Sequence, residues 1–217
     1  MSAILLFKDS ITFFIAASAI AGLVTWRKWK GNYLKWMPVY LIVLLLCEIA
    51  GYYWGLHKNY NAVRLLYQFF VIPMEISFVC RLFYNSLPVK FRKLTFVMWL
   101  IYLLCWLLEI SIFKNSSHVF LSLSYTIGNV VILILLLCYF INLVTSDDIL
   151  NFKTDIMFWI STGMLLFYLG TFPYYGLYNI MAEKYLGSFI NYTWIMIFLN
   201  YSMYSLFIAG FIWGKAK

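Results

Sequence analysis

The chain has 217 residues, of which 65% are hydrophobic, 22% are aromatic and only 11% are charged. A soluble globular protein of this size needs more polar surface than these residues supply, so the composition predicts an integral membrane protein and excludes a soluble one. The formal net charge is +8. Because the basic residues stand in short clusters between apolar stretches, they favour membrane lipids with anionic headgroups as partners and argue against nucleic acid.

Seven stretches of the chain are long and apolar enough to cross a bilayer, because a helix needs about 20 apolar residues to span the hydrocarbon core. The connections between them are short, so consecutive helices are expected to be antiparallel neighbours in one all-α, seven-helix transmembrane domain covering residues 1–217. The first stretch lacks the basic leader of a signal peptide and is predicted to be retained. The segments are Ser10 to Trp26, Leu34 to Leu56, Asn61 to Asn85, Leu94 to Phe113, Val119 to Val144, Ile156 to Ile180 and Leu186 to Trp213.

Lysine and arginine are divided unevenly between the two ends of these segments, with eleven residues on one side and five on the other. Cytoplasmic loops accumulate positive charge, so this asymmetry predicts an external N-terminus and a cytoplasmic C-terminus. The richer side carries Arg27, Lys28, Lys30, Lys35, Arg81, Lys90, Arg92, Lys93, Lys153, Lys215 and Lys217. The other side carries Lys8, Lys58, Arg64, Lys114 and Lys184.

The short acidic stretch on the richer side has a structural interpretation. Asp147, Asp148 and Asp155 surround Lys153 in the connection before the sixth segment. Aspartate is a strong helix N-cap, so these residues are expected to form a solvated cytoplasmic loop and a cap for the following helix.

The four cysteines, Cys47, Cys80, Cys105 and Cys138, all lie within apolar segments. None has a CxxC or CxxH partner, so the sequence predicts neither a disulfide framework nor a zinc site, and the cysteines are interpreted as small buried apolar residues. No metal-ligand motif, nucleophile motif or phosphate-binding glycine loop is visible, so no metal and no cofactor is predicted.

The segment from Asn61 to Asn85 is the most informative one, because its polar residues share one face. At about 100° per residue, Arg64, Gln68 and Glu75 lie on the same side of the helix. A charge near the bilayer centre costs on the order of 3 kcal/mol, so this face is expected to look at other helices or a water-filled cavity. Glu75 has no basic partner at its depth, which predicts either a protonated carboxyl or part of a proton or cation path. Pro73 can kink the helix beside it.

Two further glutamates, Glu48 and Glu109, lie within the neighbouring second and fourth segments, and Arg64 has the reach to pair with either. These carboxyls are predicted to converge on a tyrosine-rich cavity that opens outward, although interhelical hydrogen bonding alone also explains many such polar residues. Glu48, Glu75 and Glu109 are the candidate catalytic residues. The candidate ligand-binding residues are Glu48, Tyr52, Arg64, Tyr67, Gln68, Glu75, Tyr102, Glu109, Tyr125, Asn129, Tyr168 and Asn200.

The seven-helix layout with an external N-terminus resembles that of the rhodopsins, and the Phe172, Pro173, Tyr174 stretch is similar to the aromatic and proline residues around their retinal. Those pigments need a lysine in the middle of the last helix, where this chain has Asn200 and no lysine before Lys215. The resemblance therefore does not extend to a retinal cofactor. Over its full length the chain also resembles small uncharacterised bacterial seven-helix membrane proteins, which implies a multi-pass protein of the bacterial inner membrane and no particular function.

Three functions are compatible with these residues. The leading hypothesis is a binding or sensing module that takes a small amphiphile, lipid or cation into the outer cavity and signals through a cytoplasmic or membrane protein partner. The second is a membrane-embedded lipid-modifying enzyme with paired glutamates as general acid and base. The third is a proton-coupled transporter or channel with Glu75 as the proton carrier.

Overall fold

The computed structural model describes residues 2–29, 31–112, 122–176, 181 and 184–215. This part of the chain is all-α, without a β-strand, as predicted. The third predicted segment forms three consecutive elements, α4 (Tyr60–Leu66), the π-helical turn η2 (Tyr67–Val71) and α5 (Ile72–Ser86). The other long helices are α1 (Ser2–Val24), α3 (Trp36–Leu56), α6 (Val89–Ile112), α7 (Ser122–Val144), α8 (Ile156–Gly176) and α10 (Leu186–Trp213). Short elements are α2 (Trp26–Trp29), η1 (Tyr33–Lys35) and η3 (Asp147–Thr154).

Six helical segments of the described chain are long and apolar enough to cross a membrane. They are Tyr33–Leu56, Tyr60–Ser86, Val89–Ile112, Leu123–Val144, Ile156–Pro173 and Gly187–Trp213. Ser10–Val24 is apolar but shorter. The chain therefore has the helices of a multi-pass membrane protein, while the seventh crossing and the direction of the termini stay predictions.

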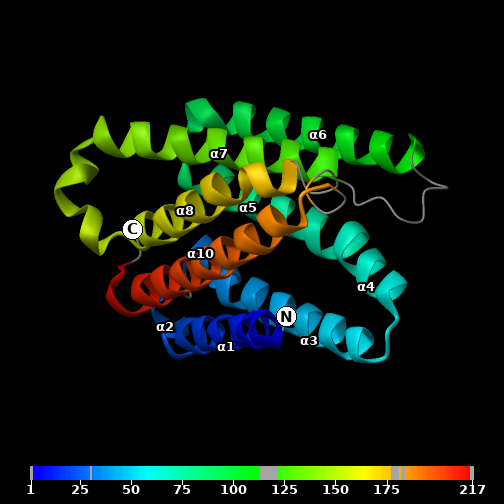
Figure 1. The fold of residues 1–217 in the computed structure, drawn as a ribbon. Coiled ribbons are helices and arrows are strands. Elements are labelled where there is room, and N and C mark those ends of the chain that lie inside the picture. Colours follow the sequence, from blue (N-terminus) through cyan, green and yellow to red (C-terminus); the bar gives the residue numbers. More distant parts are fainter. Residues whose placement is uncertain (1, 30, 113–121, 177–180, 182–183, 216–217) are drawn as a thin grey trace.

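The helices pack in layers (Figure 1). α8 and α10 lie side by side in the middle. On one side α7 packs against α8, with α6 beyond it, and on the other side α1 packs against α10, with α3 beyond it. α5 packs against both α6 and α7. The buried core contains side chains from every one of these layers, including Leu41, Ile76, Tyr102, Ile132 and Phe211.

Several helices start where the sequence supplies a capping residue. The Asn59 side chain accepts the Ala62 N–H at 3.2 Å at the start of α4, directly after Lys58 turns the chain with a φ of 56°. At the start of α8, Oδ1 of Asp155 accepts the Met157 N–H at 2.9 Å. The predicted cap at Asp155 is confirmed, but its predicted solvation is wrong, because the residue is only 8% exposed.

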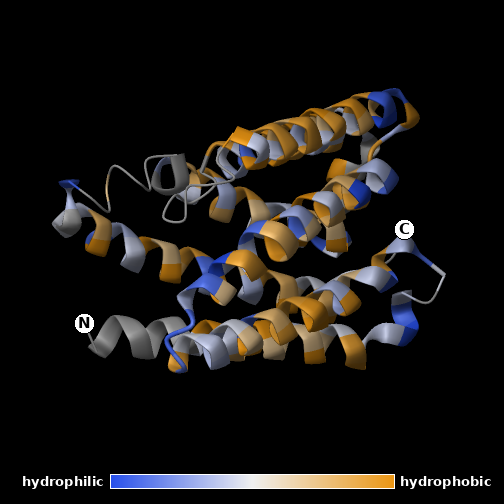
Figure 2. Ribbon diagram, turned by 90° about the vertical axis from the view of Figure 1, so that its right-hand side faces the viewer, coloured by the Kyte–Doolittle hydropathy of each residue, from blue (hydrophilic) through white to orange (hydrophobic). Residues whose placement is uncertain are grey.

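The C-terminal ends of α1 and α10 meet the start of α8 at one end of the bundle, as expected if consecutive helices alternate in direction. Lys28 Nζ, beyond the end of α1, donates to the Ile212 carbonyl of α10 at 3.0 Å, and the Lys215 N–H donates to the Thr154 carbonyl before α8 at 2.7 Å. Hydrophilic segments gather at this end, beside the C-terminus (Figure 2). We call it the basic end, because its described residues include Arg27, Lys28, Lys35, Arg81, Lys90, Arg92, Lys93, Lys153 and Lys215.

Candidate functional site at Glu75

Glu75 follows a point where the helix changes its hydrogen-bond pattern. In η2 the Ile72 N–H donates to the Tyr67 carbonyl, five residues back, as in a π-helix. The next donor in this pattern would be Pro73, which has no N–H. The helix resumes as α5 with Pro73 in its first turn, so the irregularity predicted at this proline is present. Such π-helical turns are frequent at functional sites.

The carbonyl that Pro73 leaves without a helical donor is that of Gln68, and Trp106 of α6 supplies one. The Trp106 Nε1–H donates to the Gln68 carbonyl at 3.1 Å. Because a buried carbonyl that loses its donor costs about 1–2 kcal/mol, we expect Trp106→Phe to lower the free energy of unfolding by that amount, measured by denaturant unfolding in mixed micelles.

Trp99→Phe is the matched control for this prediction. The Trp99 indole donates at 3.0 Å to the Ser77 hydroxyl. Because this hydroxyl can rotate to another partner, Trp99→Phe is expected to lower the free energy of unfolding by less than Trp106→Phe does. Equal losses for the two variants would contradict a special role for the Gln68 carbonyl.

The Glu75 carboxylate lies at the centre of a group of tyrosines from different helices. The Tyr168 hydroxyl of α8 donates to Oε1 of Glu75 at 2.6 Å. Tyr40 of α3 and Tyr102 of α6 lie within electrostatic range of the same carboxylate, as does Glu48 of α3. Glu75 itself keeps part of its surface accessible, whereas Tyr168 is 2% exposed. The site is therefore a carboxylate in the interior of the bundle, on a residue that is only partly buried as a whole.

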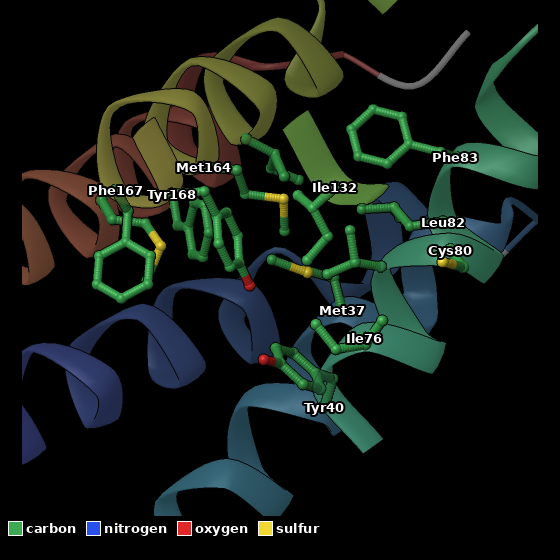
Figure 3. Close-up of a cluster of buried hydrophobic side chains, with 14 of the residues drawn as sticks. Met37, Tyr40, Ile76, Cys80, Leu82, Phe83, Ile132, Met164, Phe167 and Tyr168 are labelled. Atoms are coloured by element: carbon green, nitrogen blue, oxygen red, sulfur yellow. The ribbon is translucent and has the colours of Figure 1, made fainter. Parts of the chain in front are cut away.

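Aromatic stacking fixes one wall of this group. The Tyr40 ring stacks on Phe78 of α5, with ring centroids 4.2 Å apart and an interplanar angle of 3°. Figure 3 shows the Tyr40 and Tyr168 hydroxyls directed into the same region between the helices, close to Ile76. The stack holds Tyr40 in place, so its hydroxyl is a preorganised neighbour of Glu75.

Polar atoms with no hydrogen-bond partner within the described chain lie in the same interior. They are both amide atoms of Asn129 and the hydroxyls of Tyr102 and Ser161, and all three residues are 0% exposed. A buried polar group without a partner costs about 1–3 kcal/mol, so these side chains are expected to have a further role. Of these three residues, Tyr102 lies within electrostatic range of Glu75.

Gly128 of α7 brings two of these groups together. A Cβ at this position would lie 2.7 Å from Cδ1 of Ile76 and 3.2 Å from Cε2 of Tyr102. Gly128 therefore lets α7 approach α5 and α6 closely, at a point next to Asn129 and opposite Ile76, which follows Glu75 in the chain.

The other predicted binding residues differ from one another in burial and in contacts. Gln68 and Tyr125 are buried, and Arg64 is half-buried on α4. Tyr67 is half-buried against Gly51, where an added Cβ would lie 3.3 Å from its hydroxyl oxygen. Tyr52 is 54% exposed, and the Asn200 amide donates to the Met196 carbonyl of its own helix at 2.9 Å.

Glu109 has a different environment from Glu75. Its Oε1 accepts the Leu123 N–H at 3.1 Å and its Oε2 accepts the Ser124 N–H at 2.6 Å, while the residue is 4% exposed. A carboxylate on the first amides of a helix satisfies donors that have no intrahelical partner. The geometry gives Glu109 the role of capping α7, and its predicted part in ligand binding stays a prediction.

Tyr40 of the site and the buried Ser161 are both absent from the predicted binding residues. A signal for Tyr40 exists in the sequence, because Tyr40, Leu44, Cys47 and Gly51 follow the helical period of one buried face of α3. Ser161 precedes Tyr168 by seven residues and shares its face of α8. The four cysteines were predicted to be buried apolar residues, and Cys47 and Cys80 are buried, whereas Cys105 and Cys138 are only half-buried.

No protein-family model, curated protein or solved structure matches this chain.

Proposed function

We propose that this protein is an integral membrane binding module that takes a small cation at Glu75 and passes the occupancy of this site to a partner protein. The observation that carries the proposal is the position of Glu75, a carboxylate inside the bundle that accepts a hydrogen bond from Tyr168. Ionisable residues within membrane helices are costly, and they commonly mark ion or ligand sites.

The chemistry around Glu75 favours a cation over an anion or an apolar amphiphile. A second carboxylate, Glu48, lies within electrostatic range of Glu75. Tyrosine hydroxyls and the Asn129 amide supply neutral oxygen ligands, and hard cations prefer oxygen ligands. A bound cation would also offset the mutual repulsion of the two carboxylates.

The proposal of a partner rests on the short connections at both ends of the bundle. Three residues separate α3 from α4, and two separate α5 from α6. These two connections leave no room for an output domain between the helices, which favours a second protein as the receiver of the signal. Recovery of a co-purifying protein with wild type but not with Glu75→Gln would support this step.

The cation site is tested by thermal unfolding of the protein in lipid nanodiscs. The probes are LiCl, NaCl and KCl, each compared with N-methylglucamine chloride at equal ionic strength. At a tenfold excess over Kd, one of these cations is expected to raise the Tm of wild type by about 3–6 °C. Glu75→Gln is expected to abolish the shift, because the amide keeps the shape of the side chain and removes its charge.

Two variants are matched controls. Tyr52→Phe changes an exposed tyrosine of α3, and Asp155→Asn changes a buried carboxylate at the basic end, so both are expected to keep the shift. A shift that survives in Glu75→Gln, or that no cation produces, would refute the proposal.

A proton-coupled transporter is the second candidate, favoured by the location of Glu75 directly after the η2 turn and Pro73. Helix irregularities beside a buried carboxylate are typical of transport sites. Proton flux into proteoliposomes that depends on Glu75 would favour this candidate. The lipid-modifying enzyme would have to use Glu48 and Glu75, since both oxygens of Glu109 are engaged by α7.

A further inference from the structure

A second polar site lies at the basic end, apart from Glu75. A pocket of about 230 Å³ opens between η1, the end of α5, the end of α7 and the start of α8. Its volume is below the ~300 Å³ at which pockets for drug-sized ligands begin, so it suits a group of only a few non-hydrogen atoms.

The lining of this pocket is polar and carries one negative charge. Asp155 supplies the carboxylate, Tyr33 and Tyr139 supply hydroxyls, and Asn85 and Asn142 supply amides. No lysine, arginine or histidine belongs to the described lining. Asp155 is 8% exposed, and its Oδ2 accepts the Tyr139 hydroxyl at 3.3 Å. Its Oδ1 accepts the Met157 N–H at 2.9 Å, so the carboxylate is held in place in the lining of the pocket.

Two residues of the opposite charge are backbone neighbours of Asp155. Lys153 and Lys215 are both exposed. Lys153 precedes Asp155 by two residues, and the backbone of Lys215 forms an isolated parallel β-bridge with that of Asp155. Exposed lysines next to a bilayer attract lipid phosphate. A ligand with an ammonium group a few bonds from a phosphate would therefore match both the pocket and its rim.

We propose that this pocket binds a primary ammonium group, as carried by an ethanolamine headgroup of a lipid or by a free small amine. The three N–H donors of a primary ammonium can reach the Asp155 carboxylate, the tyrosine oxygens and an amide oxygen at once. A quaternary ammonium has no N–H donor and would leave these acceptors unmatched, so choline compounds are expected to bind more weakly.

The test is native mass spectrometry of the full chain released from micelles that contain equal amounts of phosphatidylethanolamine and phosphatidylcholine with the same acyl chains. Wild type is expected to retain the ethanolamine lipid about tenfold more than the choline lipid. Asp155→Asn is expected to reduce the ratio to about one. Asparagine caps helices as well as aspartate does, so α8 should still begin at the same residue.

Asn142→Ala provides a second variant that leaves the α8 cap unchanged and is expected to lower the ratio partially. Glu75→Gln should keep the wild-type ratio, which separates this site from the proposed cation site. An equal retention of the two lipids by wild type, or a preference that survives in Asp155→Asn, would overturn a lipid headgroup as the ligand.

Free ethanolamine and choline, added at equal concentration to lipid-free micelles, form the second arm. A rise of Tm with ethanolamine alone, lost in Asp155→Asn, would assign the pocket to soluble primary amines if the lipid arm shows no preference. Failure of both arms would refute the ammonium site.

Discussion

Replacing Glu109 by alanine is expected to lower the free energy of unfolding by about 3 kcal/mol, although this residue was predicted to bind ligand or act in catalysis. The substitution removes the acceptor for the Leu123 and Ser124 N–H groups at the start of α7. The Ser124 donor is buried, so water cannot readily replace the lost carboxylate. Denaturant unfolding in mixed micelles, followed by helical content, measures the loss.

Glu109→Gln separates the hydrogen bonds from the charge. Glutamine keeps one oxygen acceptor but no charge, so an intermediate loss of about 1–2 kcal/mol is expected. If glutamine and alanine both leave stability unchanged, the capping role is wrong. A loss of cation binding without a loss of stability would instead return Glu109 to the ligand site.

Gly128→Val is expected to cost a similar amount, about 3 kcal/mol, because the new side chain has no room. Even a Cβ would lie 2.7 Å from Cδ1 and 3.1 Å from Cγ1 of Ile76, a residue that is 0% exposed. The Tyr102 ring blocks the other side at 3.2 Å. Ile76, which the new side chain would displace, directly follows Glu75 in α5. The Gly128→Val variant is therefore also expected to weaken cation binding at Glu75.

Gly55→Val is the matched control, since no atom lies within 4 Å of a Cβ built at Gly55 of α3. Its stability is expected to remain within about 0.5 kcal/mol of wild type. Adding Ile76→Ala to Gly128→Val should cost less than the sum of the two single changes, because it removes the atoms that the valine meets. Additive losses would show that the two residues do not share the contact.

The existence and approximate ends of the long helices could be predicted from the sequence alone. The cost of burying backbone polar groups in lipid forces long apolar stretches into helices, so hydropathy is enough to predict their existence and approximate ends. The last segment was predicted from Leu186 to Trp213, and α10 has these same bounds. The irregularity at Pro73 was predictable as well, because proline lacks an N–H in any fold.

Spatial relations between helices required the tertiary structure. Glu48, Glu75 and Glu109 look alike in sequence, yet Glu109 caps α7 whereas Glu75 accepts from Tyr168, ninety-three residues away. Tyr40 joins the site through a ring stack on Phe78, and Asp155 is buried where a solvated loop was predicted. A helical period determines which face of a helix is polar, but it carries no information on which helix lies opposite. Packing between segments distant in the chain therefore decided what each carboxylate contacts.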